Sequence, residues 1–186
     1  MDVEKTTIAD VLHIRPKIWG DQRGFFVETW QQERYAAAGI RLPFVQDNHS
    51  RSRGGTLRGL HFQRRFPQGK LVSVSLGSVF DVVVDIRPDS PSFGQWYGAM
   101  LSGDNQHQLW VPPGLAHGFL VLSEVAHFHY KCTEYYHPED EGAIRWNDPD
   151  IGIIWPESPE ILLSDKDRAA PFWREVRETL PHGETR

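Results

Sequence analysis

Short apolar stretches separated by turn residues dominate the chain between residues 40 and 165. The clearest of them lie at residues 71–76, 79–86, 108–111, 118–122 and 126–133. Gly, Pro, Asn and Asp lie between these stretches, and apolar runs bounded by such residues are typical of β-strands. The pattern therefore predicts an all-β fold of many short strands, of the jelly-roll or barrel class.

Two stretches have helical character, at residues 30–38 and 166–180. The first is followed by Gly39, which suits the position just after a helix, and the second is interrupted by Pro171. Because these helices flank the strands and do not alternate with them, the pattern argues against a parallel βαβ sheet. We find no repeat, low-complexity segment or linker, so we expect one domain over residues 1–186 with a frayed tail at 182–186.

Composition excludes several classes of partner. An apolar content of 39% and a charged content of 24% over 186 residues are ordinary for a soluble domain with a sizeable core. A net charge of −5 argues against a general binder of nucleic acid or of anionic membranes. The chain has no apolar run of the ~20 residues that a spanning helix needs, and no signal-type N-terminus. The single cysteine, Cys132, excludes an internal disulfide and fits a reducing compartment, so we expect a cytoplasmic protein.

Candidate chemistry gathers in the strand-like segment LRGLHFQ at residues 57–63 and in the QGK that ends at Lys70. An Arg binds anionic groups, a His transfers protons near neutral pH and a Lys stabilises oxyanion charge. Arg58 and His61 differ in parity, so a regular strand would send them to opposite faces. Gly59 offers a site for a β-bulge that would resolve this conflict.

The sequence also predicts the surroundings of polar side chains in two further strands. Tyr130 shares a face with the apolar Ala126 and Phe128, and a buried Tyr hydroxyl needs a hydrogen-bond partner. Two carboxylates, Asp81 and Asp85, lie inside the apolar stretch 79–86, where they also need partners. For Asp85 a simple partner would be Arg87, two residues along the chain.

These motifs resemble those of the dTDP-4-dehydrorhamnose 3,5-epimerase (RmlC-like) family of the cupin superfamily. The resemblance covers roughly residues 5–175 and includes RGLHFQ, QGKLV and PPGLAHGF. It implies a cupin jelly roll with short flanking helices, an active form that is usually a homodimer, and no cofactor. It also implies an isomerase that epimerises C3 and C5 of dTDP-4-dehydro-6-deoxy-D-glucose to give dTDP-4-dehydro-L-rhamnose.

The resemblance assigns four catalytic residues. His61 would be the base, Asp167 its partner, Lys70 the group that faces the sugar keto oxygen, and Tyr130 the general acid. From the sequence alone, a lone His in an apolar strand is more often structural, and a Lys at a strand start is usually exposed. Asp167 likewise fits the first turn of a short helix capped by Ser164.

The resemblance also implies a set of substrate contacts. Arg23 and Arg58 would hold the diphosphate, Glu28 would meet the thymine and Tyr136 would stack on it. From the sequence alone, Asp21 and Arg23 also fit a solvated turn, because the Asp-x-x-Gly sequence at residues 21–24 is a turn signature. In dimers of this family, this N-terminal strand can contribute contacts to the site of the partner subunit. The full set of implied contacts is Arg23, Glu28, Gln46, Asn48, Arg58, His117, Tyr136, Glu141 and Lys166. Asp81 is expected to support this site without touching the substrate, because a carboxylate inside an apolar strand needs a partner.

Gln46 and Asn48 alternate with Asp47 and His49, so on a strand the two pairs would face opposite ways. A turn role for these polar residues is about as well founded as a binding role.

Three other functions stay open. An epimerase of one carbon only, C3 or C5, would use the same residues. A metal-dependent cupin would carry a His-x-His pair, whereas here His61 is followed by Gln63, so we expect no metal. A sugar-binding module without catalytic activity would not need a base and an acid together. We therefore predict that a dTDP-linked 4-keto-6-deoxy sugar is the partner of this site.

Overall fold

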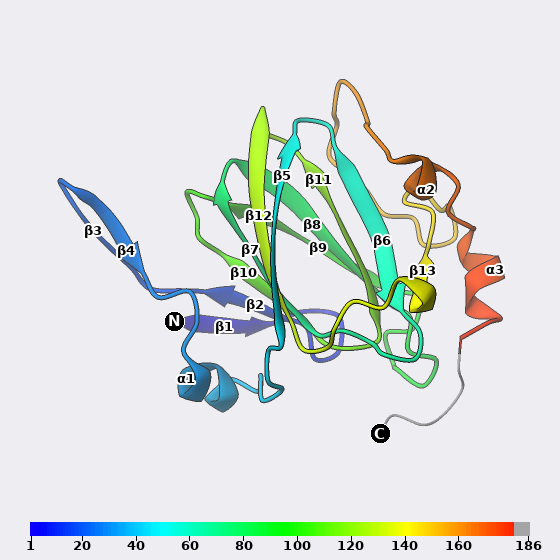
Figure 1. Cartoon of the computed structure of the whole chain (residues 1–186), viewed down its shortest axis with the longest axis horizontal. Coiled ribbons are helices and arrows are strands. Elements are labelled where there is room, and N and C mark those ends of the chain that lie inside the picture. The colour runs from blue at the N-terminus through cyan, green and yellow to red at the C-terminus, as the bar shows by residue number, and fades with distance from the viewer. Residues whose placement is uncertain (181–186) are drawn as a thin grey trace.

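Two antiparallel β-sheets pack face to face in the computed structural model of the chain, which describes residues 1–180 (Figure 1). The six-stranded sheet has the order β1 (Asp2–Lys5), β2 (Leu12–Arg15), β10 (Gln108–Val111), β7 (Lys70–Leu76), β12 (Val125–Cys132) and β5 (Gln46–Arg53). The five-stranded sheet has the order β13 (Glu141–Ala143), β6 (Leu57–Gln63), β11 (Leu115–Val121), β8 (Ser78–Asp85) and β9 (Trp96–Ser102). The predicted all-β architecture is confirmed.

The main core lies between the two sheets. Val72 and Phe128 from the six-stranded sheet and Val83 and Phe119 from the five-stranded sheet belong to one buried cluster. The rings of Phe119 and Phe128 stack with their centroids 4.1 Å apart. Tyr130 packs against this cluster, as the alternation of its strand predicts.

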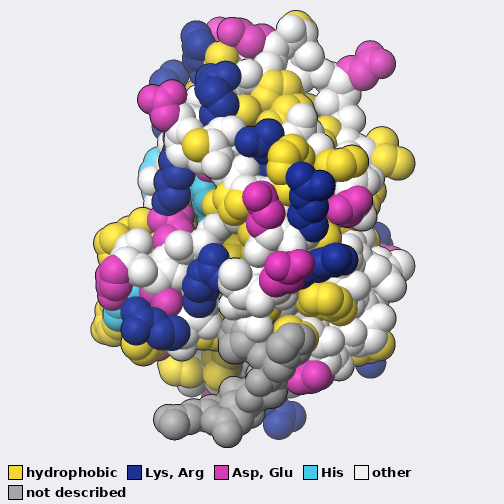
Figure 2. Space-filling view, turned by 90° about the vertical axis from the view of Figure 1, so that its right-hand side faces the viewer, with side chains coloured by type: hydrophobic (Ala, Val, Ile, Leu, Met, Phe, Trp, Pro, Cys, Tyr) yellow, Lys and Arg dark blue, Asp and Glu magenta, His cyan; other side chains and the backbone are white. Residues whose placement is uncertain are grey.

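A second apolar layer covers the other face of the five-stranded sheet. Val82 and Val84 of β8 pack there with Trp173 and Val176 of the C-terminal segment. That segment forms α2 (Asp165–Arg168) and α3 (Trp173–Arg177), with Pro171 between them, so the predicted helix at 166–180 is two short helices. Proline removes a backbone donor and disfavours a helical residue before it, which explains the break. Figure 2 looks onto this side of the molecule and shows acidic and basic side chains interspersed over it.

The first helix, α1 (Gln32–Ala37), closes the opposite side of the fold. Its Tyr35 is buried beside Ile14 and Trp110, on the outer face of the six-stranded sheet. Gly39 follows the helix with φ 108°, a conformation that favours glycine. The predicted helix end is confirmed.

The expected bulge is present in β6. His61 lies opposite His117 and Arg58 lies opposite Phe119, so three steps of β6 span two steps of β11. Gly59 has φ 127°, and a Cβ there would lie 2.6 Å from the Cα of Gly118. Only glycine fits this close approach of two backbones.

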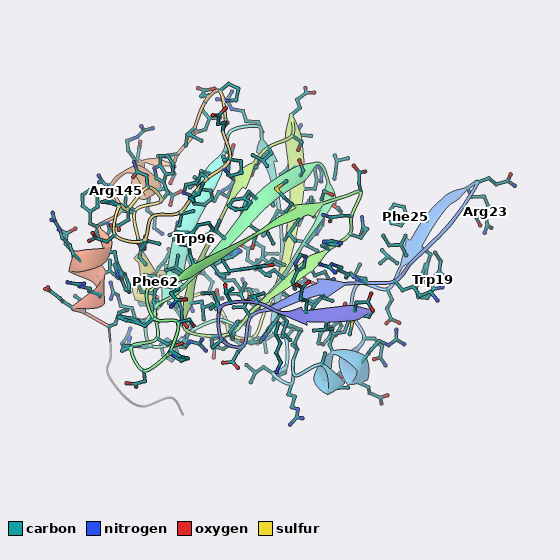
Figure 3. The ribbon with its side chains drawn as sticks, turned by 180° about the vertical axis from the view of Figure 1, so that it is seen from behind. Trp19, Arg23, Phe25, Phe62, Trp96 and Arg145 are labelled. Atoms are coloured by element: carbon teal, nitrogen blue, oxygen red, sulfur yellow. The ribbon has the colours of Figure 1, made fainter. Side chains whose placement is uncertain are left out.

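A hairpin of β3 (Ile18–Asp21) and β4 (Gly24–Val27) projects away from both sheets (Figure 1). Its turn is held by a hydrogen bond from the backbone N–H of Arg23 to Asp21 Oδ1 (2.8 Å), as the Asp-x-x-Gly signature predicts. Trp19, Phe25 and Phe26 on this hairpin are 45%, 58% and 67% exposed. Figure 3 shows Trp19 and Phe25 along the hairpin and Arg23 at its tip.

The sequence located some strands of both sheets but not all of them. The five predicted stretches correspond to β7, β8, β10, β11 and β12. Strand β9 was not predicted, because its sequence WYGAMLS has neither clean alternation nor β-branched residues. No helix within residues 1–180 is long and apolar enough to cross a membrane. The frayed tail expected at 182–186 lies outside the described residues.

Candidate active site

A pocket of about 230 Å³ opens between the two sheets, and both sheets contribute to its wall. The five-stranded sheet supplies residues of β6 and β13, and the six-stranded sheet supplies residues of β5, β7 and β12. The residues that line it are Gln46, Asn48, His61, Phe62, Gln63, Gln68, Lys70, Tyr130, Tyr136 and Glu141. The fold thus brings together seven residues that the sequence singled out, namely Gln46, Asn48, His61, Lys70, Tyr130, Tyr136 and Glu141.

His61 is held by a carboxylate 106 residues further along the chain. Its Nε2 lies 2.5 Å from Oδ1 of Asp167, whose side chain is almost fully buried. Ser164 caps α2 and donates from its hydroxyl to Asp167 Oδ2 (2.9 Å). Burial acts to raise the pKa of Asp167, but the hydrogen bond and charge of His61, together with Ser164, hold that pKa below its usual range. Asp167 therefore remains a carboxylate that orients His61, and the expected helix cap is also present.

Lys70 begins β7 and is partly enclosed by the pocket. Burial lowers the pKa of Lys70, while Cys132, Asp81 and Glu141 act in the opposite direction. An ammonium that has lost part of its hydration interacts more strongly with a nearby oxyanion than one in bulk water.

Tyr130 enters the pocket from β12, on the sheet opposite His61. Burial raises the pKa of its hydroxyl, the nearby Cys132 adds to this, and the charge of Arg58 opposes it. A phenol with a raised pKa stays protonated near neutral pH, so it can donate a proton.

The outer part of the pocket contains a chain of polar contacts. Tyr136 donates from its hydroxyl to Glu141 Oε2 (2.7 Å), and the ammonium of Lys166 forms an ion pair with the same carboxylate. This hydrogen bond, together with burial, raises the pKa of Tyr136 to about 12. Burial acts to raise the pKa of Glu141, but Lys166 and Tyr136 hold it below its usual range.

Polar residues of β5 continue this part of the wall. Gln46 accepts a hydrogen bond from the backbone N–H of Tyr136 (3.0 Å) and donates to Asn48 Oδ1 (3.1 Å). The alternate residues Asp47 and His49 face outward, where they contact Lys131 and His127 respectively. The predicted division of this strand is confirmed.

His117 and Asp81 form a buried pair behind the pocket, with 2.9 Å between Nε2 and Oδ2. His117 lies directly opposite His61 in the sheet but is not part of the pocket wall. Burial raises the pKa of Asp81, which His117 and Lys70 oppose. The other carboxylate of this strand, Asp85, pairs with Arg87 at 2.8 Å, as the sequence suggested.

Three of the arginine and glutamate positions lie outside the pocket wall. Arg58 is exposed and donates to Ser52 Oγ (3.1 Å). Arg23 pairs with Asp21 at 2.5 Å on the hairpin, and Glu28 pairs with Arg34 at 2.6 Å beside α1. A single chain therefore does not bring Arg23 or Glu28 to the pocket.

Within residues 1–180, no group of three or more His, Cys, Asp or Glu side chains is placed to hold a metal ion. The donors that could approach an ion at the pocket are already paired, His61 with Asp167 and Glu141 with Lys166.

Comparison with known proteins identifies the architecture and the class of reaction. The profile of the dTDP-4-dehydrorhamnose 3,5-epimerase family matches residues 5–175. The dTDP-4-dehydrorhamnose 3,5-epimerase of Salmonella typhimurium is 57% identical over 174 residues, which cover 92% of this chain and 95% of that protein. The chain belongs to this epimerase family. It is an isomerase, and its two sheets form a cupin-type jelly roll.

Two solved structures resemble this epimerase over nearly its whole length. The RmlC epimerase of Legionella pneumophila, in complex with dTDP-4-keto-L-rhamnose, superposes with a TM-score of 0.94 at 53% identity and covers 99% of each chain. ChmJ, a 3′-monoepimerase from Streptomyces bikiniensis in complex with dTDP-quinovose, gives a TM-score of 0.89 at 34% identity and covers 95% of this chain and 91% of its own. One fold thus carries both double and single epimerases.

Three pocket residues of this epimerase were not assigned from the sequence, namely Phe62, Gln63 and Gln68. Gln63 follows His61 by two residues and therefore lies on the same face of β6, which is a signal that the sequence did contain. Gln68 precedes Lys70 by two residues, but it lies in a loop where alternation predicts nothing.

Proposed function

We propose that this pocket epimerises both C3 and C5 of dTDP-4-dehydro-6-deoxy-D-glucose through an enolate and yields dTDP-4-dehydro-L-rhamnose. The observation that supports it most is that His61 and Tyr130 line one pocket from opposite sheets. A base on one wall and an acid on the other can remove a proton from one face of a carbon and return one to the other face. That is the requirement for inversion.

His61 acts as the base. Its Nε2 hydrogen-bonds to Asp167, which fixes the tautomer with the proton on Nε2 and leaves Nδ1 free to accept the proton from carbon. The electrons of the broken C–H bond move into the enolate, whose oxygen at C4 is stabilised by Lys70. General base catalysis supplies about 10²–10⁴-fold, and each well-placed oxyanion donor supplies about 10²–10³-fold.

Tyr130 completes the inversion by donating its phenolic proton to the opposite face of the same carbon. The enolate electrons form the new C–H bond and the ketone is restored. Proton exchange with solvent then returns His61 and Tyr130 to their starting states, after which the second carbon reacts in the same way. Since both carbons flank the same C4 carbonyl, one Lys70 serves both steps.

The polar outer part of the pocket binds the nucleotide. Tyr136 stacks on the thymine, while Gln46, Asn48, Glu141 and Lys166 supply hydrogen bonds and charge around the sugar and the base. Arg58 lies near enough to Tyr130 to influence its pKa, and it holds the diphosphate at the pocket entrance. His117 and Asp81 support Lys70 and His61 from behind.

We also propose that the active form is a cytoplasmic homodimer of single-domain subunits, in which each hairpin completes the partner's site. Arg23 and Glu28 would contact the nucleotide in the partner. This is supported by the projection of the hairpin from its own subunit and by the exposure of Trp19, Phe25 and Phe26, apolar side chains that a second subunit would cover (Figure 3). The single, reduced cysteine fits the cytoplasm.

A second function, epimerisation of one carbon only, has support from the likeness to the 3′-monoepimerase. The two functions are separated by incubating the enzyme with dTDP-4-dehydro-6-deoxy-D-glucose in deuterium oxide and locating the label by NMR. Label at both C3 and C5 is the expected result. Label at one carbon would replace the double epimerase with the single one, and absence of label would overturn both.

A further inference from the structure

The amide of Gln63 is buried at the pocket wall and is fully occupied by backbone groups of two loops. Its Nε2 donates to the carbonyl of Phe66 (2.6 Å) and to the carbonyl of Tyr135 (3.1 Å). Its Oε1 accepts from the backbone N–H of His137 (2.8 Å). Both amide protons are used, so Gln63 has no donor left for a substrate although it borders the pocket.

The same two loops, residues 64–69 and 133–140, are tied together along their length. Asp140, which is buried, accepts hydrogen bonds from the backbone N–H groups of Arg65 (2.8 Å) and Phe66 (2.9 Å). The rings of Phe66 and His137 stack with centroids 4.4 Å apart. At the other end, Gln68 donates to the carbonyl of Glu134 (2.8 Å).

Tyr136 lies between the two residues of the second loop that Gln63 holds. Its own side chain is 50% exposed and contacts Glu141 through the hydroxyl. Packing alone therefore does not fix the position of this ring. The backbone on both sides of it is fixed by Gln63, since the carbonyl of Tyr135 and the N–H of His137 both bind that one amide.

We propose that Gln63 is a positioning residue that fixes the Tyr136 loop to the strand carrying His61, so that the nucleotide-binding ring stands at a set distance from the base. The inference rests on the proposed role of Tyr136 in binding the nucleotide. Gln63 occupies the sequence position where metal-dependent cupins carry their second His. In this chain the side chain at that position hydrogen-bonds to the backbone of the two loops. Preorganising a loop lowers the entropy that substrate binding would otherwise cost.

The test compares Gln63→Met, which keeps the length of the side chain but removes the amide, with Asn105→Leu as a control. Asn105 also makes three hydrogen bonds to backbone groups, with Ser102, His107 and Met100, but it lies in the β9–β10 turn outside the pocket wall. For Gln63→Met we expect the KM for the sugar nucleotide and the Kd of dTDP to rise about 10-fold, with kcat within about 3-fold of wild type. Asn105→Leu should change neither KM nor kcat.

A double variant shows whether Gln63 acts through Tyr136. We expect Gln63→Met to weaken dTDP binding, measured by calorimetry, in the wild-type background, and to add nothing in the Tyr136→Ala background. Asp140→Asn, which loosens the same pair of loops from the other side, should behave in the same way and serves if Gln63→Met does not fold. Thermal melts establish folding for each variant.

The outcomes distinguish a failure of the Gln63 role from a failure of the proposed nucleotide-binding role of Tyr136. Additive losses in the double variant, or a fall in kcat with an unchanged Kd for dTDP, would overturn the positioning role of Gln63 alone. If Tyr136→Ala leaves the Kd for dTDP unchanged, the assigned role of Tyr136 fails and the role of Gln63 fails with it. Gln63→Glu keeps an acceptor for His137 but places a carboxylate against two carbonyls, so wild-type KM in that variant would also overturn the proposal.

Discussion

The pocket and the projecting hairpin both carry residues predicted to contact the substrate, but they are built in opposite ways. In the pocket, His61 is paired with a buried carboxylate and Glu141 with two partners from separate elements. On the hairpin, Arg23 contacts only Asp21, two residues away in the same turn, and its side chain is 84% exposed. One region is organised by long-range contacts, and the other is organised only by its own turn.

In the proposed function, this difference separates the chemistry that one subunit completes from the contacts that a second copy would supply. Groups that must transfer protons are fixed by packing within one subunit, because small errors in their placement cost large factors in rate. Groups that only hold the nucleotide can come from an element that is ordered by the partner. The comparison therefore predicts large effects on kcat in the pocket and effects on KM at the hairpin.

The largest effect should come from His61→Asn. The side chain keeps similar reach but cannot accept the proton, so kcat should fall by about 10²–10⁴-fold. Solvent exchange at C3 and C5, followed by NMR in deuterium oxide, should fall by the same factor. His127→Asn on the outward face of β12 is the control and should retain activity. Wild-type exchange in His61→Asn would remove His61 from the role of base.

Tyr130→Phe should separate exchange from inversion. The ring still packs against the core cluster beside Phe128, but the proton donor is lost. His61 can then form the enolate and return a proton to the same face, so exchange should continue while net epimerisation falls by about 10²-fold or more. NMR of the product in deuterium oxide reports both events. Inversion of either carbon at the wild-type rate would exclude Tyr130 as the acid.

Arg23→Ala should affect KM, by about 10-fold, with little change in kcat. Mixing this variant with His61→Asn tests whether the hairpin acts in the partner. A mixed dimer would then contain one site with both His61 and Arg23, and random reassortment would give about a quarter of all sites this composition.

At substrate concentrations well below the wild-type KM, the activity of an equimolar mixture should exceed the sum of the two separate variants, because about a quarter of the sites regain both residues. If Arg23 served its own subunit, no site in the mixture would contain both residues. In that case the mixture would show only the sum of the two separate variants.

The smallest effect concerns stability. The pKa of Asp167 is lowered, so its carboxylate stabilises the fold above pH 3.8, its usual pKa, and this contribution is lost as the pH falls through the lowered native value. Asp167→Asn should therefore reduce the free energy of unfolding by about 1.5–3 kcal/mol near neutral pH. The difference from wild type should shrink below pH 3.8 in urea titrations.

The hairpin supplies the matched control for this measurement. The pKa of Asp21 is also lowered, by its hydrogen bonds to Arg23, but this pair lies in solvent. Asp21→Asn should leave the free energy of unfolding unchanged at every pH, because water screens exposed pairs. A pH-independent difference between wild type and Asp167→Asn would contradict the role of that ion pair in stability.

Local features of this protein could be predicted from neighbouring residues. The turn at residues 21–24, the bulge at Gly59, the cap at Ser164 and the outward direction of Asp47 and His49 all depend on a few adjacent positions. The seven pocket residues were found because their motifs resemble those of a known family. Strand periodicity by itself identifies a face and does not identify what lies across from it.

Without the family resemblance, which implied the pairing of His61 with Asp167, only the tertiary structure decides which distant groups meet. His61 contacts Asp167 because α2 packs beside β6, and Glu141 meets Lys166 for the same reason. The hydrogen bonds of Gln63 were also visible only in the fold, since its partners Phe66 and Tyr135 lie in two loops that are far apart in the sequence. Such contacts form only when long stretches of chain close around a common core. The entropic cost of that closure is offset by the packing of the whole chain, so no single position in the sequence reveals the contact.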